Sequence, residues 1–148
     1  MDLNLSGKHI LITGGSKGIG LACAQAFLAE GARVSLVSRS EANLTRARES
    51  LSAFGTDRVQ THAADLTQAA SAQAALDAAI AIFGPVDVLV NSAGAAKRTP
   101  APELSPQAWH DAMQAKYFSY IHMIDPVIKQ MGQRGKGNIV NVVGNGGK

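Results

Sequence analysis

The sequence predicts an α/β protein built on a doubly wound parallel sheet with helices on both faces. Short apolar runs at 8–13, 33–38, 58–63, 86–90 and 138–143 read as strands, and they alternate with longer stretches that have helical spacing. Parallel strands need a crossover between them, and that crossover is usually a helix. Because such crossovers are right-handed, the alternation restricts the topology to doubly wound forms.

The first half of the chain is marked by glycine and serine boundaries. The run 8–13 is β-branched and stops at glycines, and a helix over 18–30 follows, with Gly31 closing its C-terminal end. The strand 33–38 comes next. Ser40 is a suitable N-cap for a helix from 41 to about 54.

The second half repeats this alternation of strands and helices, and the ends of its elements are marked more clearly. The strand 58–63 precedes an alanine-rich helix over 67–83, which ends at Gly84-Pro85. The strand 86–90 is almost wholly apolar and is therefore expected to be buried on both faces. After a loop over 91–104, Ser105 and Pro106 predict a helix start, and the helix runs, with or without a break, to about Gly132. A polar turn at 133–137 leads into the strand 138–143.

Composition excludes several classes of protein. The chain has 148 residues, 46% hydrophobic and 17% charged, with a formal charge of +3, which is typical of one globular domain with a real core. A single cysteine excludes a disulfide framework and a cysteine-built zinc site. Scattered basic residues and few aromatics argue against a nucleic-acid partner. No apolar run is long enough for a membrane span, and no signal peptide is visible, so we expect a cytoplasmic protein without a membrane partner.

The histidines and the cysteine suggest no chemistry of their own. The four histidines lack metal-ligand spacing, so we expect no metal site and place each at the surface or at a strand end: His9, His62, His110 and His122. Cys23 lies among alanines in the first helix and is expected to be a small buried hydrophobe.

A glycine-rich turn over 13–20 joins the first strand to the first helix. Its glycines permit a tight turn and a close backbone approach to a ligand, and the helix N-terminus offers free N–H groups to a pyrophosphate. The hydroxyl of Ser16 can add a donor. The turn is not a Walker A loop, because Gly18-Ile19-Gly20 stands where that loop has Gly-Lys-Ser/Thr.

The glycine spacing, with three residues between Gly14 and Gly18 and one between Gly18 and Gly20, resembles the cofactor turn of the short-chain dehydrogenase/reductase family. Asn91-Ser92-Ala93-Gly94 resembles the family's second motif, and Asp65-Leu66 is similar to its adenine-contacting pair. The approach to the fifth strand also follows the family pattern, at Trp109, Pro126, Met131, Gly135 and Gly137. The resemblance covers essentially the whole chain.

This resemblance implies a Rossmann-type sheet with strand order 3-2-1-4-5 and a single dinucleotide-binding domain over 1–148. We expect the C-terminal part of the usual domain to lie outside the chain; a complete five-strand flavodoxin-like domain without its last helix is the alternative. The implied activity is hydride exchange between a nicotinamide cofactor and a ketone or secondary alcohol, and the implied assembly is a homodimer or homotetramer. The late helix supports assembly, since it has more apolar surface than one side of a sheet needs, at Ile121, Ile124, Val127, Ile128 and Met131.

The end of the second strand predicts NADP(H) rather than NAD(H). An acidic residue there binds the ribose hydroxyls of NAD, whereas basic residues pair with the 2′-phosphate of NADP. Ser38 stands in place of the acidic residue, Arg39 is next to it, and Lys17 lies in the glycine turn. The alternative interpretation is that both cations are solvent-facing charges on loops without a ligand.

The resemblance also implies the remaining cofactor contacts. Asp65 and Leu66 would hold the adenine, and the ribose and nicotinamide would run along Asn91, Ala93 and Gly94. Asp65 can equally act as a charge before the following helix, and Asn91 can equally brace its loop. The predicted cofactor-binding set is Gly14, Ser16, Lys17, Gly18, Ile19, Gly20, Ser38, Arg39, Asp65, Leu66, Asn91, Ala93 and Gly94.

The catalytic pattern of the family is only partly covered. The family uses a Tyr as acid/base, a Lys that lowers its pKa, a Ser that orients the substrate oxygen and an Asn in a proton relay. The Asn position falls at Lys116 and the Ser position at Gly144, with Asn145 next to it, while the Tyr and Lys would follow about a dozen residues later. No catalytic residue is therefore assigned within the chain.

These departures leave alternatives open. Lys116 either takes over the proton relay or forms a salt bridge at an interface, and we favour the structural role. Asn145 either orients a carbonyl or is a turn residue, and Tyr117 and Tyr120 are interpreted as packing or subunit contacts. The leading hypothesis is an NADP(H)-dependent dehydrogenase or reductase. The alternative is an inactive or atypical member that binds the cofactor as a sensing or interaction protein.

Overall fold

The computed structural model describes residues 1–94 and 97–144, and these residues form one five-stranded parallel sheet of order β3-β2-β1-β4-β5. All neighbouring strands are paired in parallel. The fold class and the strand order expected from the sequence are thereby confirmed. The strands are β1 (His9–Thr13), β2 (Arg33–Ser38), β3 (Val59–Ala63), β4 (Val88–Asn91) and β5 (Asn138–Asn141).

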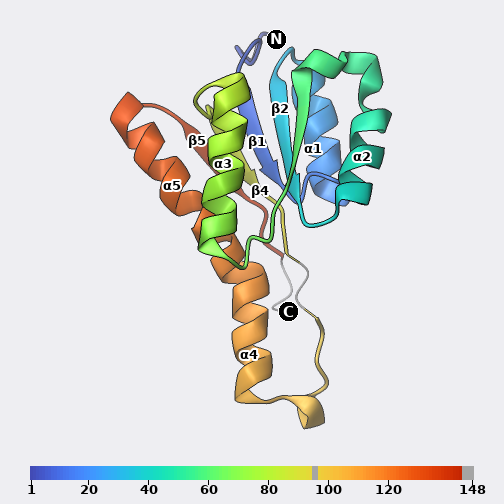
Figure 1. Ribbon diagram of the computed structural model, residues 1–148, viewed down its shortest axis with the longest axis vertical. Coiled ribbons are helices and arrows are strands. Elements are labelled where there is room, and N and C mark those ends of the chain that lie inside the picture. The colour runs from blue at the N-terminus through green and yellow to red at the C-terminus, as the bar shows by residue number, and fades with distance from the viewer. Residues whose placement is uncertain (95–96, 145–148) are drawn as a thin grey trace.

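The helices cover both faces of the sheet (Figure 1). One face carries α1 (Gly18–Ala29) and α2 (Glu41–Ser50), and the other carries α3 (Ala69–Phe83) and α5 (Ser119–Arg134). Alternate residues of each strand supply the two cores: Ile10 and Ile12 face α1 and α2, and Leu11 faces α3 and α5. In the described ranges, no helix has both the length and the apolar character that a bilayer crossing demands.

The helix α4 (Pro106–Met113) lies apart from this sandwich. It extends below the sheet in Figure 1, beyond the carboxyl ends of the strands. Its N-cap is the predicted one, because the hydroxyl of Ser105 accepts the amide of Ala108 at 3.2 Å. Ser40 caps α2 in the same way, through the amide of Asn43. A π-helical turn over Gln114–Phe118 separates α4 from α5, so the long helix expected from the sequence is broken.

The boundaries of α2 and α3 differ from those expected. The helix α2 ends at Ser50 instead of residue 54, because Ser52–Phe54 tighten into a 3-10 turn that Gly55 closes with a φ of 98°. The helix α3 begins at Ala69 instead of residue 67, because the carboxylate of Asp65 accepts hydrogen bonds from both the amide and the hydroxyl of Thr67.

The start of β4 and the end of β5 also shift. Residue 86 was expected to open the fourth strand, but β4 begins at Val88, because the Gln130 side chain bonds both the amide and the carbonyl of Val86. The strand β5 ends at Asn141 instead of residue 143, although the amide of Val142 still donates to the carbonyl of Asn91 at 2.9 Å.

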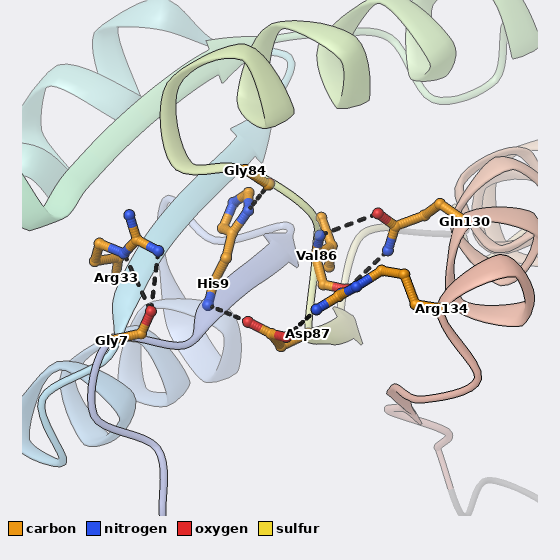
Figure 2. A network of polar contacts seen from close by, with 8 residues as sticks. All are labelled: Gly7, His9, Arg33, Gly84, Val86, Asp87, Gln130 and Arg134. Atoms are coloured by element: carbon orange, nitrogen blue, oxygen red, sulfur yellow. Dashed lines mark hydrogen bonds and ion pairs between the residues drawn. The ribbon is translucent and has the colours of Figure 1, made fainter.

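A polar network closes the amino ends of β1 and β4 (Figure 2). Its centre is His9, which is fully buried. It stands at a strand start as expected, but the surface position considered for it is wrong. Its Nδ1 lies 2.8 Å from the carbonyl of Gly84 and its Nε2 lies 2.6 Å from the hydroxyl of Ser35. A carbonyl only accepts, so Nδ1 carries the proton and Nε2 accepts from Ser35.

Asp87 links this network to α5. One carboxylate oxygen accepts the backbone amide of His9 at 2.9 Å, and the other pairs with the guanidinium of Arg134 at 3.0 Å. Burial alone raises the pKa of Asp87, but these two interactions outweigh it and leave the pKa below its ordinary value. The pKa of His9 is lowered, chiefly because burial disfavours the imidazolium.

Stability should therefore fall as the pH drops through the ordinary histidine range. The unfolded chain takes up a proton at His9 near pH 6.5, while the folded chain resists it until a lower pH. We expect the free energy of unfolding in urea to decrease from pH 7.5 to 5.5, and His9 contributes at most about 1.4 kcal/mol per pH unit to this decrease. The lowered pKa of Asp87 acts only at more acidic pH.

The variant His9→Gln should reduce this slope, and the exposed-site control His110→Gln should keep it. A residual slope is expected in His9→Gln, because burial also lowers the pKa of His62. An unchanged slope in His9→Gln would contradict the assignment.

Candidate functional site

A cavity of about 500 Å³ opens at the carboxyl ends of β1, β2 and β4, where α1 begins. In this strand order the connections change direction between β1 and β4, which is where open α/β sheets bind ligands. The cavity brings together most of the predicted cofactor residues, namely Gly14, Ser16, Lys17, Gly18, Ile19, Ser38, Arg39, Asp65, Leu66, Ala93 and Gly94.

Gly14 is held between two strand ends. Its amide donates to the carbonyl of Val37 at 2.8 Å, and its φ is +65°. A Cβ atom at this position would lie only 2.8 Å from the backbone of Ala93. A Cβ at Gly20 would collide with the carbonyl of Gly14, so Gly20 packs behind the turn and does not line the cavity. The turn therefore needs glycine here for close backbone approach.

The start of α1 is open toward the cavity. Lys17 occupies the N-cap position without a capping side chain, and the first turn of the helix has no acidic residue. Gly18 has a φ of +57°, and a Cβ there would meet nothing within 4 Å. The N–H groups and the positive end of the helix are thus left for an anion, which is what a pyrophosphate requires.

The hydroxyl group of Thr13 fixes the wall of the cavity that follows β4. Its hydroxyl oxygen accepts the amides of Ser92 and Ala93, at 3.2 and 3.3 Å. Asn91 lies behind this wall, fully buried, and its amide donates to the side-chain oxygen of Asn141 at 2.9 Å. Asn91 thus braces β4 against β5, and the wall of the cavity that follows β4 is formed by Ser92, Ala93 and Gly94.

Polar groups gather at the mouth of the cavity, beyond β2 and β3. The hydroxyl of Ser16 donates to that of Ser38 at 3.0 Å, and the side chains of Lys17 and Arg39 are exposed. The carboxylate of Asp65 is also exposed; hydrogen bonds from Thr67, with a smaller contribution from the charge of Arg39, lower its pKa. Asp65 therefore both orders the turn before α3 and faces the cavity, so the two roles considered for it are compatible.

The inner end of the cavity has residues that sequence reasoning did not place in the site. They come from the π-helical turn, the start of α5 and the residues after β5: Ala115, Lys116, Ser119 and Val142. Lys116 had a signal, because it stands at the family's Asn position. Ala115 and Ser119 had none, since their approach to the strand ends depends on how the broken helix packs. Gly144 is exposed, and Asn145 lies outside the described residues.

Comparison with known proteins agrees with this geometry. The family model for short chain dehydrogenase matches residues 8–148. The chain belongs to this family. The membership accounts for the glycine turn and the Asn91–Gly94 motif on one sheet, and it confirms the resemblance carried by the sequence motifs.

Individual family members are similar to this chain in sequence and in fold. A D-threitol dehydrogenase of Mycolicibacterium smegmatis is 41% identical over 143 residues, which is 95% of this chain and 54% of the relative. The crystal structure of L-sorbose reductase from Gluconobacter frateurii, complexed with NADPH and L-sorbose, is 33% identical, with a TM-score of 0.87 over 95% of this chain and 54% of that one. A structure of actinorhodin polyketide ketoreductase with NADPH is 32% identical, with a TM-score of 0.89 over 99% and 56%. The chain spans about half the length of the relatives it matches.

The two glycines with positive φ in the turn should respond differently to alanine. Gly14→Ala places a methyl group against the Ala93 backbone, so we expect it to lower the free energy of unfolding by several kcal/mol or to prevent folding. Gly18→Ala meets open space and should cost only about 1 kcal/mol, from its left-handed φ. Urea unfolding of both variants measures this. Equal losses at the two positions would contradict the close approach of Gly14 to Ala93.

Proposed function

We propose that the whole protein is an NADP(H)-dependent oxidoreductase that exchanges hydride between the nicotinamide and a ketone or secondary alcohol. In this proposal residues 1–148 supply its dinucleotide-binding domain. The observation that carries the proposal is the set of groups around one cavity: the free N-terminus of α1, Lys17 and Arg39, with no acidic residue at the end of β2. The coenzyme supplies the hydride, and this chain supplies its binding site.

The pyrophosphate is assigned to the amides at the start of α1, beside Gly18 and Ile19. The 2′-phosphate is assigned to Arg39 and Lys17, whose exposed side chains face the mouth of the cavity. Asp65 and Leu66 would hold the adenine. The ribose and nicotinamide would run along the wall formed by Ala93 and Gly94, which is braced from behind by Asn91.

Relatives support this proposal. The D-threitol dehydrogenase and the L-sorbose reductase are oxidoreductases by name, and two of the solved structures hold NADPH. A 2′-phosphate distinguishes NADP(H) from NAD(H), so the two cations at the mouth of the cavity are the groups that decide the preference.

The whole protein should bind NADPH more tightly than NADH, as measured by titration calorimetry. Arg39→Ala should weaken NADPH binding by roughly 10- to 100-fold, because it removes a charge-assisted contact with the 2′-phosphate, and should change NADH binding little. Arg48→Ala, at an exposed position on α2, serves as the matched control and should leave both affinities unchanged. Tighter binding of NADH by the unaltered protein would refute the NADP(H) preference.

A second candidate function is a cofactor-binding protein without dehydrogenase activity. The observation in its favour is that Lys116 and Gly144 stand where the family has its catalytic Asn and Ser. Binding of NADPH without turnover, across a broad panel of carbonyl compounds and alcohols, would favour this function over the first.

We also propose that the protein assembles as a homodimer or homotetramer. Trp109 and Met113 on α4 and Tyr117 on the π-helical turn are exposed large side chains at successive four-residue intervals. On α5, Val127 and Met131 are buried in the core, whereas Ile128 is exposed. Apolar side chains grouped in this way on one protruding helix are typical of a protein interface.

Light scattering on the whole protein should give a dimer or tetramer. Trp109→Glu should shift it toward the monomer, since it places a charge within the apolar group. Ile82→Glu, at an equally exposed apolar position on α3, is the control and should not. A monomeric unaltered protein would count against assembly.

A further inference from the structure

Lys116 is a half-buried cation at the inner end of the cavity, and the proposed function leaves it without a role. It lies on the π-helical turn beside Gly94, and it lines the cavity together with Val142. Val142 is two residues before Gly144, where the family has its substrate-orienting Ser. This part of the cavity is therefore where substrate would meet the coenzyme in the proposed function, on which the following inference rests.

The ammonium group of Lys116 is held by weak contacts with neutral groups. Its Nζ lies 3.4 Å from the hydroxyl of Tyr120, 3.5 Å from the carbonyl of Gly94 and 5.2 Å from the centre of the Tyr120 ring. Tyr120 is itself fixed, because its hydroxyl donates to the carbonyl of Val142 at 2.6 Å. The hydroxyl oxygen of Tyr120 is therefore an acceptor toward Lys116.

These contacts leave hydrogen-bonding capacity unused. An ammonium group has three N–H donors, and the two neutral oxygens engage at most two of them, at the long limit for a hydrogen bond. The third donor is available to a group in the cavity. Within the described residues the ion pairs are Lys129–Asp125 and Arg134–Asp87, so this part of the chain gives Lys116 no counter-charge.

A half-buried charge without a counter-charge favours an anionic ligand. An anionic oxygen bound here could belong to the substrate or to the coenzyme. The coenzyme's pyrophosphate already has the open N-terminus of α1, so the substrate is the better source.

We propose that Lys116 is a specificity-determining residue that binds the carboxylate of an oxo-acid or hydroxy-acid substrate. Tyr120 positions it by holding the ammonium between Gly94 and the end of β5. The family's Asn at this position is neutral and could not make this selection, so the substitution would direct the protein toward acidic substrates.

The test uses the whole protein loaded with NADP⁺ and a panel of short 2-oxo and 3-oxo acids, each paired with its primary amide. Binding is followed by calorimetry, so that the result does not depend on turnover. The unaltered protein and Lys116→Arg should bind at least one acid roughly tenfold more tightly than its amide. Lys116→Met and Lys116→Gln should bind both forms equally. The control Lys129→Met, which removes an exposed lysine on α5, should retain the preference.

The outcomes separate the possible roles of Lys116. The inference is overturned if the unaltered protein does not prefer any acid, or if the preference survives in both neutral variants. If the neutral variants instead lose NADP⁺ affinity that Lys116→Arg retains, the bound anion is the coenzyme's pyrophosphate, and the assignment to a substrate carboxylate is wrong. If the unaltered protein binds no nicotinamide coenzyme, the proposed function fails first, and the loading step detects this separately. Thermal unfolding of each variant shows whether it folds.

Discussion

The candidate site depends on how closely three strand ends approach one another. The backbone of Gly14 donates to the end of β2 at Val37 and leaves no room for a side chain against Ala93 after β4. Thr13 adds to this contact, because its one hydroxyl oxygen accepts the amides of Ser92 and Ala93. These contacts turn the chain sharply into α1, so the helix N-terminus opens onto the cavity instead of being covered.

The local pattern was sufficient to predict the element types and the two serine caps, and the resemblance of the motifs supplied the strand order. Apolar period, glycine stops and capping residues act over a few positions, and they agree with one another along most of the chain. The boundaries failed where a distant or non-periodic side chain competes for the backbone. The side chain of Gln130, 44 positions away in the sequence, hydrogen-bonds the backbone of Val86, so that β4 begins only after it. The hydroxyl of Thr67 donates to the carboxylate of Asp65, so that α3 begins later than expected. Nothing near the start of β4 indicates the contact with Gln130, whereas the Asp65–Thr67 contact is local but leaves no trace in the apolar period.

The same distinction applies to the site. The glycine turn could be predicted because its conformation is set by adjacent residues. The bracing role of Asn91 follows from its bond to Asn141, and these two residues meet only when β5 pairs with β4. The burial of His9 is a similar case, since its partners Ser35 and Gly84 come from separate segments. The sequence allowed Asn91 either a ligand contact or a bracing role and His9 either a surface or a strand-end position, and the assembled sheet encloses both.

The two ends of the sheet differ in how their polar groups are satisfied. At the amino ends, His9, Asp87 and Arg134 bind one another or nearby backbone, and in the described residues no buried side-chain polar atom lacks a hydrogen bond. At the carboxyl ends, Lys17, Arg39 and Lys116 line one cavity and enter neither of the ion pairs formed by the described residues. Charges paired at one end contribute to the fold, whereas at the other end Lys17 and Arg39 are exposed and Lys116 is half-buried, and all three positive charges are available to a bound anion. With the N-terminus of α1 beside Lys17, this distribution of positive charge suits an extended ligand with several separated anionic groups, as a phosphorylated dinucleotide next to an acidic substrate would be.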